Sequence, residues 1–323
     1  MTKDILQMTV PTPFDVGDVH LYLLKGDVLT LVDGGVKTKE AWDILKEQLK
    51  KNHIEPKDIE QIVLTHHHPD HIGLLEQFDP KYGIVGDQQI QKWLRREEEY
   101  FLRYEDFFKN LYYQSGVPKE FESSLSTLRG PLKYVARGEL SGVLKEGDTL
   151  PGHEAWKVIE TAGHAQSHLS FFRERDGAFL SGDHILPHIS SNPLLEPPLN
   201  AGEERPRPLL QYRENLKKCM ELSIKTVLPG HGEIFTHPQK LVESRLLKQE
   251  KRAMRVKEML KKGPQTAFQI CVQLFPMHYE KEFELTMSET IGQLDYLESE
   301  RLISSEYKEN HLYYYEKEKE QSQ

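Results

Sequence analysis

The stretch that decides the fold is THHHPDH, residues 65–71, which follows directly on the apolar run Ile62, Val63 and Leu64. The apolar run predicts a short buried strand, so the polar stretch begins where that strand leaves its sheet. A loop at a strand end can direct several side chains into one cleft. Within six residues it carries four potential metal ligands, namely His66, His68, Asp70 and His71.

Three shorter motifs downstream repeat this arrangement. TAGH at residues 161–164, SGD at 181–183 and LPGHG at 228–232 each follow a run with strand character, and each brings a ligand-type residue after a glycine: His164, Asp183 and His231. Imidazole and carboxylate together suit zinc, iron or manganese, and the absence of thiolate disfavours a closed structural zinc site. Four such motifs in order predict one shared metal centre.

The remaining pattern predicts a mixed α/β layer architecture. Strands are expected at residues 19–24 and 28–32 as a hairpin, and at 62–64, 84–85, 157–160, 169–172, 178–180 and 226–228. A helix capped by Thr38 should bury Ala41, Leu45 and Leu49. Residues 72–78 have the character of the first turns of a helix. The proline-rich residues 186–208 should form an extended loop.

Residues 87–130 form an expected helical insertion that is rich in aromatic side chains, from Trp93 to Tyr113. An aromatic helix pair could cover the cleft and bind an apolar or acyl group. The rings could equally pack the helices on the core or form a dimer contact. The sequence leaves these alternatives open.

From residue 241 the chain changes character and outlines a winged helix. A long basic helix over 241–260 is followed by a short helix capped by Thr266, a third helix with Met287, Ile291, Leu294 and Leu297 on one face, and a two-stranded ribbon at 302–307 and 311–315. The third helix carries five acidic residues between Glu284 and Glu300 and no Lys or Arg. Such a helix would repel phosphate, so we expect the region to make protein contacts rather than bind nucleic acid.

The four motifs resemble those of the metallo-β-lactamase superfamily, and the resemblance spans roughly residues 5–240. It implies a four-layer αββα sandwich as a catalytic domain over residues 1–240, followed by a small winged-helix-like domain over 241–323. It also implies two divalent metal ions, zinc first and manganese or iron as alternatives. His66, His68 and His164 would hold the first ion, Asp70, His71 and His231 the second, and Asp183 would bridge them.

Two cations about 3.5–4 Å apart can share a water and lower its pKa toward neutrality. The resulting hydroxide would attack a carbonyl or phosphoryl centre, with Asp70 as the catalytic proton acceptor and later donor. Asp33, in the turn VDGG, is a candidate to orient a ligand imidazole. We expect His67 to point away from the metals and His168 to orient or pack. His188 and Asn192, in the loop after Asp183, are candidate substrate contacts.

Composition sets further limits. The 323 residues carry 42 Lys and Arg against 51 Asp and Glu, a net charge of −9, which argues against a broad non-specific nucleic-acid binder. No apolar run approaches the 18 or so residues of a membrane span, and the start of the chain lacks the pattern of a secretory signal. The two cysteines, Cys219 and Cys271, form neither a disulfide framework nor a CxxC knuckle. We therefore expect a cytoplasmic protein.

The preferred function is a metal-dependent hydrolase of a small ester, thioester or lactone. The alternative is an endoribonuclease or phosphodiesterase of the same superfamily. A metal-sensing regulator that reads DNA is a weaker reading, because the third C-terminal helix is acidic. An iron-dependent oxygenase or redox centre is also weaker, because no second cofactor motif is present. The expected partner is a small-molecule substrate. A homodimer is also possible, in which the apolar stripe of the third C-terminal helix would pack on a second subunit.

Overall fold

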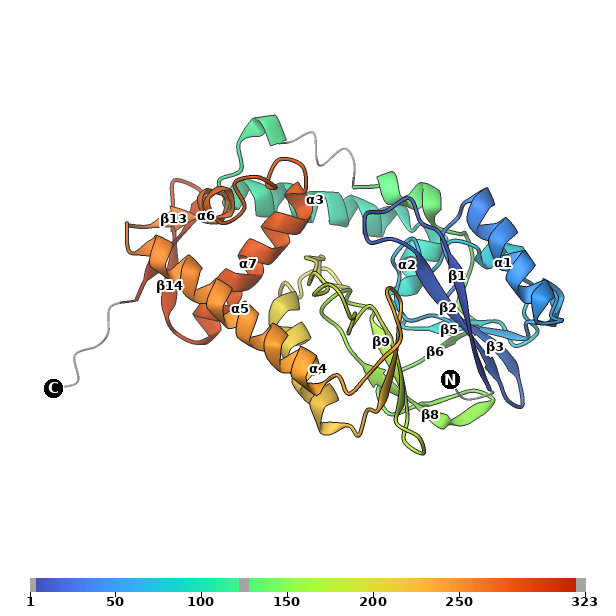
Figure 1. Ribbon diagram of the computed structural model, residues 1–323. Helices are drawn as coiled ribbons and strands as arrows, with labels where there is room; N and C mark the ends of the chain where they lie inside the picture. Colours follow the sequence, from blue (N-terminus) through green and yellow to red (C-terminus); the bar gives the residue numbers. More distant parts are fainter. Residues whose placement is uncertain (1–3, 122–127, 318–323) are drawn as a thin grey trace.

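The computed structural model describes residues 4–121 and 128–317, and its centre is a pair of six-stranded sheets (Figure 1). The first sheet has the order β1-β2-β3-β4-β5-β6. Its strands are β1 (Ile5–Val10), β2 (Val19–Lys25), β3 (Leu29–Val32), β4 (Gln61–Val63), β5 (Ile84–Gly86) and β6 (Gly142–Val143). The second sheet has the order β12-β11-β10-β9-β8-β7. Its strands are β7 (Thr149–Leu150), β8 (His153–Glu160), β9 (Leu169–Arg173), β10 (Ala178–Gly182), β11 (Thr226–Pro229) and β12 (Phe235–Thr236).

The two sheets face each other across an apolar core, and helices cover their outer faces. Val63 and Val85 of the first sheet meet Val158, Phe171 and other buried side chains of the second. The helices α1 (Lys39–Lys51) and α2 (Ile90–Arg95) pack on the first sheet, and α4 (Pro208–Glu221) packs on the second. The expected four-layer αββα order is confirmed.

The directions of the strands bring together the strand ends that the four motifs follow. β3 and β4 are parallel, as are β10 and β11. β8 runs antiparallel to β9, and β9 runs antiparallel to β10, so β8 points the same way as β10 and β11. The loops that leave β8, β10 and β11 therefore emerge at one edge of their sheet. The loop after β4 meets them there, so the four motifs of the sequence lie together.

Most of the predicted elements are confirmed, including the hairpin of β2 and β3 and the helix capped by Thr38, whose hydroxyl accepts from the amide of Ala41. β1 and α4 are additional to the prediction. The helix predicted at residues 72–78 is wrong, since only a short 3-10 turn at Leu75–Gln77 forms there. The amides of Gly73 and Leu74 donate instead to the carbonyls of Gly35 and Gly34. These bonds tie the end of the loop after β4 to the turn after β3.

The aromatic segment forms α2 and α3 (Glu98–Gln114), and its rings pack into two different cores. Arg96, in a left-handed conformation, separates the two helices. Trp93 and Phe101 pack into the core outside the first sheet, whereas Tyr112 packs into the C-terminal core. Residues 122–127 of the predicted insertion lie outside the described residues. Figure 1 shows α3 running along the top of the molecule, from the sheets to the C-terminal helices.

The C-terminal region packs on the rest of the chain through α5 and α7. It contains α5 (Gln239–Leu260), α6 (Ala267–Leu274) and α7 (Phe283–Ser299), together with a small antiparallel sheet of β13 (Gln265–Thr266), β15 (His311–Glu316) and β14 (Ile303–Lys308). The N-terminal half of α5 belongs to the core outside the second sheet and its C-terminal half to the C-terminal core. The apolar stripe of α7 is buried within the chain, and α7 contacts α4 as well as α5 and α6. No helix among the described residues combines the length and apolar character of a membrane span.

Gly292 on α7 tests how closely α7 and α4 must pack. A Cβ atom at this position would lie 2.9 Å from the Cβ of Leu209 on α4, so a side chain forces the helices apart. We expect Gly292→Leu to lower the free energy of unfolding by about 1–3 kcal/mol, although leucine favours a helix more than glycine does. Denaturant unfolding measures this, with Gly138→Leu as the control because a Cβ added at Gly138 would meet no described atom within 4 Å. Equal stability of both variants would contradict the tight contact.

Candidate metal centre

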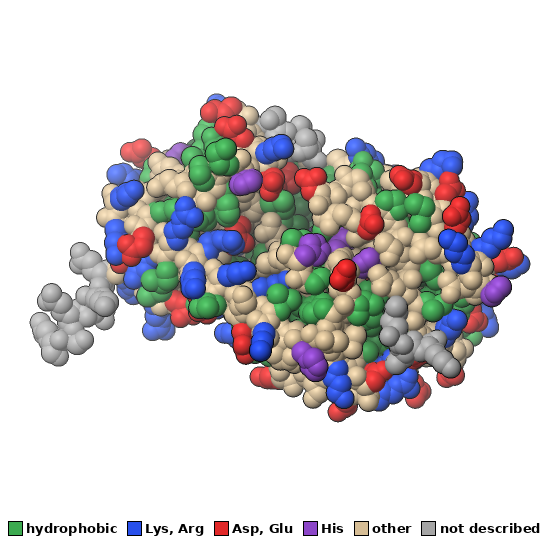
Figure 2. Space-filling model, in the orientation of Figure 1, with side chains coloured by type: hydrophobic (Ala, Val, Ile, Leu, Met, Phe, Trp, Pro, Cys, Tyr) green, Lys and Arg blue, Asp and Glu red, His purple; other side chains and the backbone are tan. Residues whose placement is uncertain are grey.

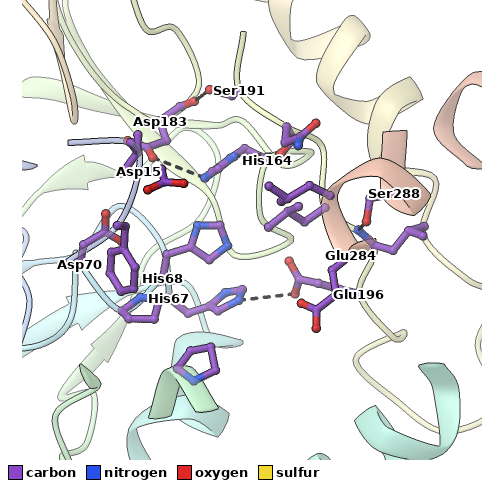
Figure 3. A pocket seen from close by; sticks show the side chains of 18 of the residues that line it. Asp15, His67, His68, Asp70, His164, Asp183, Ser191, Glu196, Glu284 and Ser288 are labelled. Carbon is purple, nitrogen blue, oxygen red and sulfur yellow. Dashed lines mark hydrogen bonds and ion pairs between the residues drawn. The ribbon is translucent and has the colours of Figure 1, made fainter. Parts of the chain in front are cut away.

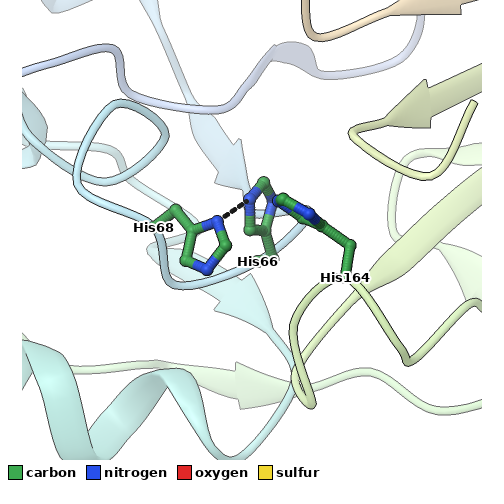
Figure 4. Close-up of side chains that lie close together, drawn as sticks. All are labelled: His66, His68 and His164. Atoms are coloured by element: carbon green, nitrogen blue, oxygen red, sulfur yellow. Dashed lines mark hydrogen bonds between the residues drawn. The ribbon is translucent and has the colours of Figure 1, made fainter. Parts of the chain in front are cut away.

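The four motifs of the sequence meet at the edge of the sandwich where their strands end. Three groups of side chains there bring their ligand atoms within 4.8 Å of one another. The groups are His66, His68 and His164; His66, His71 and Asp183; and Asp70, His71 and His231. Figure 4 shows the first group, in which the Nε2 atom of His66 lies 3.0 Å from the Nδ1 atom of His68.

Asp183 lies between two sets of candidate ligands, one of His66, His68 and His164 and the other of Asp70, His71 and His231. Its carboxylate oxygens are 3.5 Å from Nε2 of His71, 3.5 Å from Nε2 of His164 and 3.4 Å from Nε2 of His231. Asp70 approaches Nε2 of His231 from another side, at 3.2 Å. One carboxylate is thus placed in reach of both sets.

The ligand atoms fit a bound cation. The Nε2 atoms of His71, His164 and His231 and the Oδ1 atom of Asp183 are buried and have no hydrogen-bond partner in the described part of the chain. Buried polar atoms are normally paired, and a cluster of unpaired nitrogen and carboxylate atoms is what a divalent metal would satisfy. The donor set of imidazole and carboxylate without thiolate agrees with zinc, manganese or iron.

The opposite nitrogens of these three rings are held by the protein, which fixes how the rings point. Nδ1 of His164 donates to the carbonyl of Asn192 over 3.0 Å, and Nδ1 of His231 donates to the carbonyl of Asp18 over 2.7 Å. Nδ1 of His71 donates to Asp33 over 2.8 Å. In each ring this leaves Nε2 as the atom directed into the centre.

Asp33 positions two of the candidate ligands. It accepts from His71 directly, and it also accepts the hydroxyl of Thr65, whose oxygen lies 2.9 Å from Nδ1 of His66. The residue is buried and has a φ of 66°, in the left-handed region. That conformation turns its carboxylate from the end of β3 toward the loop after β4. The predicted orienting role of Asp33 thus has a structural basis.

His168 and Gly230 shape the site around Asp183. The backbone amide of Asp183 donates to Nε2 of His168 over 3.0 Å, while Nδ1 of His168 lies 2.8 Å from the hydroxyl of Thr161. His168 therefore holds the backbone of Asp183. A Cβ at Gly230 would stand 2.2 Å from Oδ1 of Asp183, so the LPGHG motif needs glycine at this position.

The histidines on the two sides of the centre have pKa values shifted in opposite directions. Burial opposes the charged form of His231, but Asp183 and Asp70 outweigh burial and raise its pKa to about 10. His66 and His68 have pKa values well below the ordinary value, mainly through burial and then through the neighbouring histidines. The centre thus presents neutral imidazoles on one side and imidazoles paired with carboxylates on the other.

A cavity of about 570 Å³ opens onto this centre. His68, Asp70, His164 and Asp183 form its polar end, and its other walls are largely apolar (Figure 3). The apolar lining comes from several elements and includes Phe14, Val16, Trp93, Tyr104, Phe108, Leu128, Leu186, Ile189, Leu194, Leu195 and Leu285. Figure 2 shows histidine and apolar side chains gathered in a hollow between the C-terminal helices and the sheets.

The remaining predicted residues fall in different places. His67 belongs to none of the three groups; it stacks on Trp93 with ring centroids 4.5 Å apart, and burial lowers its pKa to about 3. It nevertheless lines the cavity. Asn192 also lines the cavity, and it holds His164 through its backbone carbonyl. His188 does not line it, because its side chain is exposed in a separate hollow beside His20.

Sequence reasoning missed the acidic residues of the cavity wall. These are Asp15 in the loop after β1, Glu196 in the proline-rich segment and Glu284 on α7. No spacing rule links them to the metal motifs. The only signal in the sequence was the placement of Glu196 in a loop that begins at Asp183.

Comparison with known proteins gives the family. The sequence profile of the metallo-beta-lactamase superfamily matches residues 14–231, and the chain belongs to this superfamily. A probable metallo-hydrolase of Bacillus subtilis (strain 168), YqjP, is 43% identical over 313 residues, which are 97% of this chain and 98% of the relative. The likeness therefore extends through the C-terminal region.

Two further similarities concern structure and activity. A metallo-beta-lactamase family protein from Thermus thermophilus superimposes with a TM-score of 0.79 at 25% identity, over 97% of this chain and 99% of that one. A ribonuclease of Thermus thermophilus is 29% identical over 223 residues, which are 66% of this chain and 47% of the relative.

Removing the charge of Asp33 should weaken metal binding. Asp33→Asn keeps the shape but replaces an acceptor of His71 and Thr65 with an amide, so we expect metal affinity to fall by about 10–100-fold. Competition with a chromogenic chelator measures the affinity, and circular dichroism checks the fold. Asp43→Asn, on the exposed face of α1, is the matched control. Unchanged affinity in the Asp33 variant would show that the hydrogen bonds do not position the ligands.

Proposed function

We propose that this chain is a dinuclear metal-dependent hydrolase that cleaves a small ester, thioester or lactone whose apolar part occupies the cavity. The observation that carries the proposal is the cavity itself, which joins a cluster of metal-ligand side chains to walls that are largely apolar. Such a cavity can remove an acyl or other apolar group from water while its polar end faces the scissile bond. Hydrolase chemistry agrees with membership of the superfamily.

His66, His68 and His164 would hold one divalent ion, Asp70, His71 and His231 the other, and Asp183 would contact both. We propose zinc, which imidazole and carboxylate ligands suit, with manganese or iron as alternatives. Bound ions would supply Lewis acidity toward the carbonyl oxygen and would lower the pKa of a water at the site.

The chain's own residues would handle the proton and the substrate. In the hydrolysis, the oxygen of water bonds to the carbonyl carbon, the bond to the alkoxy or thiol leaving group breaks, and one proton of the water passes to that group. Asp70 lines the cavity and has its carboxylate beside His231, so it is placed to accept this proton and return it to the leaving group. The apolar walls would orient the substrate and exclude water from its buried part.

A nuclease or phosphodiesterase remains the second candidate, and the ribonuclease relative is what favours it. The cavity argues against it. Among the described residues, no Lys or Arg lines the cavity, whereas Asp15, Glu196 and Glu284 do. Away from the metal centre, a phosphodiester would therefore meet acidic groups and no Lys or Arg among the described residues that line the cavity.

The C-terminal region supports the same choice. We propose that it resembles a winged helix in outline but serves as a wall of the cavity rather than as a reader of nucleic acid. α7, which would be the helix entering a groove, is largely buried and contributes Glu284, Leu285 and Ser288 to the cavity. We also propose a cytoplasmic location, because Cys219 and Cys271 are both free and buried.

Asp183 provides the test of the dinuclear site. Asp183→Ala removes the carboxylate in reach of both sets of candidate ligands, so we expect metal content below two ions per chain and turnover lower by orders of magnitude, with the chain still folded. Elemental analysis of the purified protein measures the metal. His67→Ala is the control, since His67 belongs to neither ligand set, and it should keep the metal content of the unaltered protein. Full metal occupancy and normal turnover in the Asp183 variant would overturn the assignment.

The substrate class is tested with a panel of chromogenic compounds. The metal-loaded protein is offered aryl esters and thioesters with acyl chains of increasing length, a lactone and a phosphodiester. The proposal expects hydrolysis of a carbonyl substrate, with kcat/KM rising as the acyl chain fills the apolar walls. Hydrolysis of the phosphodiester alone would instead establish the nuclease or phosphodiesterase reading.

A further inference from the structure

Two acidic residues line the part of the cavity wall away from the metal centre, Glu196 buried and Glu284 exposed. Glu196 comes from the proline-rich segment and Glu284 from α7, and Figure 3 shows both side chains directed into the cavity. The two residues are far apart in the sequence. A hydrogen bond from the amide of Leu195 to the hydroxyl of Ser288 joins their two segments directly beside them.

Glu196 is 4% exposed, yet no Lys or Arg among the described residues pairs with it. Its Oε1 atom accepts from the amide of Gln166 over 2.8 Å, and the imidazole of His67 lies 3.8 Å from Oε2. Burial raises the pKa of Glu196 to about 8, and the carboxylate of Asp87 adds to this. With this pKa the carboxyl of Glu196 is largely protonated at neutral pH, and a cationic ligand in the cavity would stabilise its ionised form.

Aromatic rings surround the same part of the cavity. Trp93, Tyr104 and Phe108 line it, with ring centroids 6.0 Å apart for Trp93 and Tyr104 and 5.0 Å apart for Tyr104 and Phe108. Burial raises the pKa of Tyr104, and Tyr100, Glu196 and Glu284 raise it further. Aromatic faces attract cations, and most strongly where water is excluded.

We infer that Glu196, Glu284 and the rings of Trp93, Tyr104 and Phe108 form a subsite for a positively charged alkylammonium group of the substrate. This inference rests on the proposed function, since the cation would anchor the substrate while the scissile carbonyl faces the metal centre. The carboxylates would balance the charge of the ammonium group, and the aromatic rings would contact its alkyl groups. A metal ion has no alkyl groups, so the rings favour an alkylammonium ion over a metal ion as the occupant. Among the described residues, the only groupings of His, Cys, Asp and Glu that could hold a metal lie at the centre described above.

The experiment compares two probes of the same shape. Choline carries a trimethylammonium group, and 3,3-dimethyl-1-butanol replaces it with a neutral tert-butyl group. Titration calorimetry on the full-length, metal-loaded protein at about pH 8.5, where a carboxyl with the pKa of Glu196 is largely ionised, should show choline binding at least about tenfold more tightly. Both probes carry the same hydroxyl group, so contact of that group with the metals cancels in the ratio.

Glu196→Gln is the decisive variant. Its amide oxygen can still accept from Gln166, so the variant removes the charge and keeps the hydrogen bond. The preference for choline should fall to about a few-fold or less, because most of the attraction in a low-dielectric cavity comes from the charge. Glu154→Gln, on the exposed side of β8, is the matched control and should keep the full preference.

The outcomes separate the subsite from the proposed function. Equal binding of the two probes, or a preference that survives in Glu196→Gln, overturns the subsite. If the protein hydrolyses neutral esters but shows no preference for choline, the subsite alone fails and the hydrolase proposal stands. If choline is preferred and lost in Glu196→Gln while no carbonyl substrate is cleaved, the subsite stands and the proposed reaction fails.

Discussion

The rest of the structure depends on a set of buried imidazole and carboxylate atoms that point into the metal centre. Among the described residues, these atoms have no hydrogen-bond partner. Nε2 atoms of three histidines and one oxygen of Asp183 converge there. The free-energy cost of leaving such atoms unpaired is large, and a bound divalent ion would offset it. The fold is arranged to hold these atoms in place, since four strands end at this edge and each delivers one motif.

Around the converging atoms, the protein fixes each ring through its other nitrogen. The partners are two backbone carbonyls for His164 and His231, and the carboxylate of Asp33 for His71. Asp18 follows β1 of the first sheet and His231 follows β11 of the second, so their hydrogen bond joins the two halves of the sandwich. The C-terminal helix α7 extends this assembly, because it closes the cavity on the side away from the centre.

The metal motifs could be predicted because their information is local. Each motif lies within a few residues of a strand end, and the parallel strands bring those ends together. Other features depended on packing between distant segments. The turn at residues 72–78 looked helical, but the hydrogen bonds of Gly73 and Leu74 go to the turn after β3. Glu196 and Glu284 line the same cavity because α7 lies beside the proline-rich segment, and no pattern in either segment indicates this. α4 was not anticipated, although Pro208 at its first turn is compatible with a helix start.

The central claim is that the seven side chains form one centre for two ions. Anomalous diffraction from crystals of the full-length protein grown with zinc tests it most directly. The account predicts two peaks about 3.5–4 Å apart. One should be bounded by His66, His68 and His164, the other by Asp70, His71 and His231, with Asp183 between them. A single peak, or a strong peak elsewhere with this edge of the sandwich empty, would contradict the account.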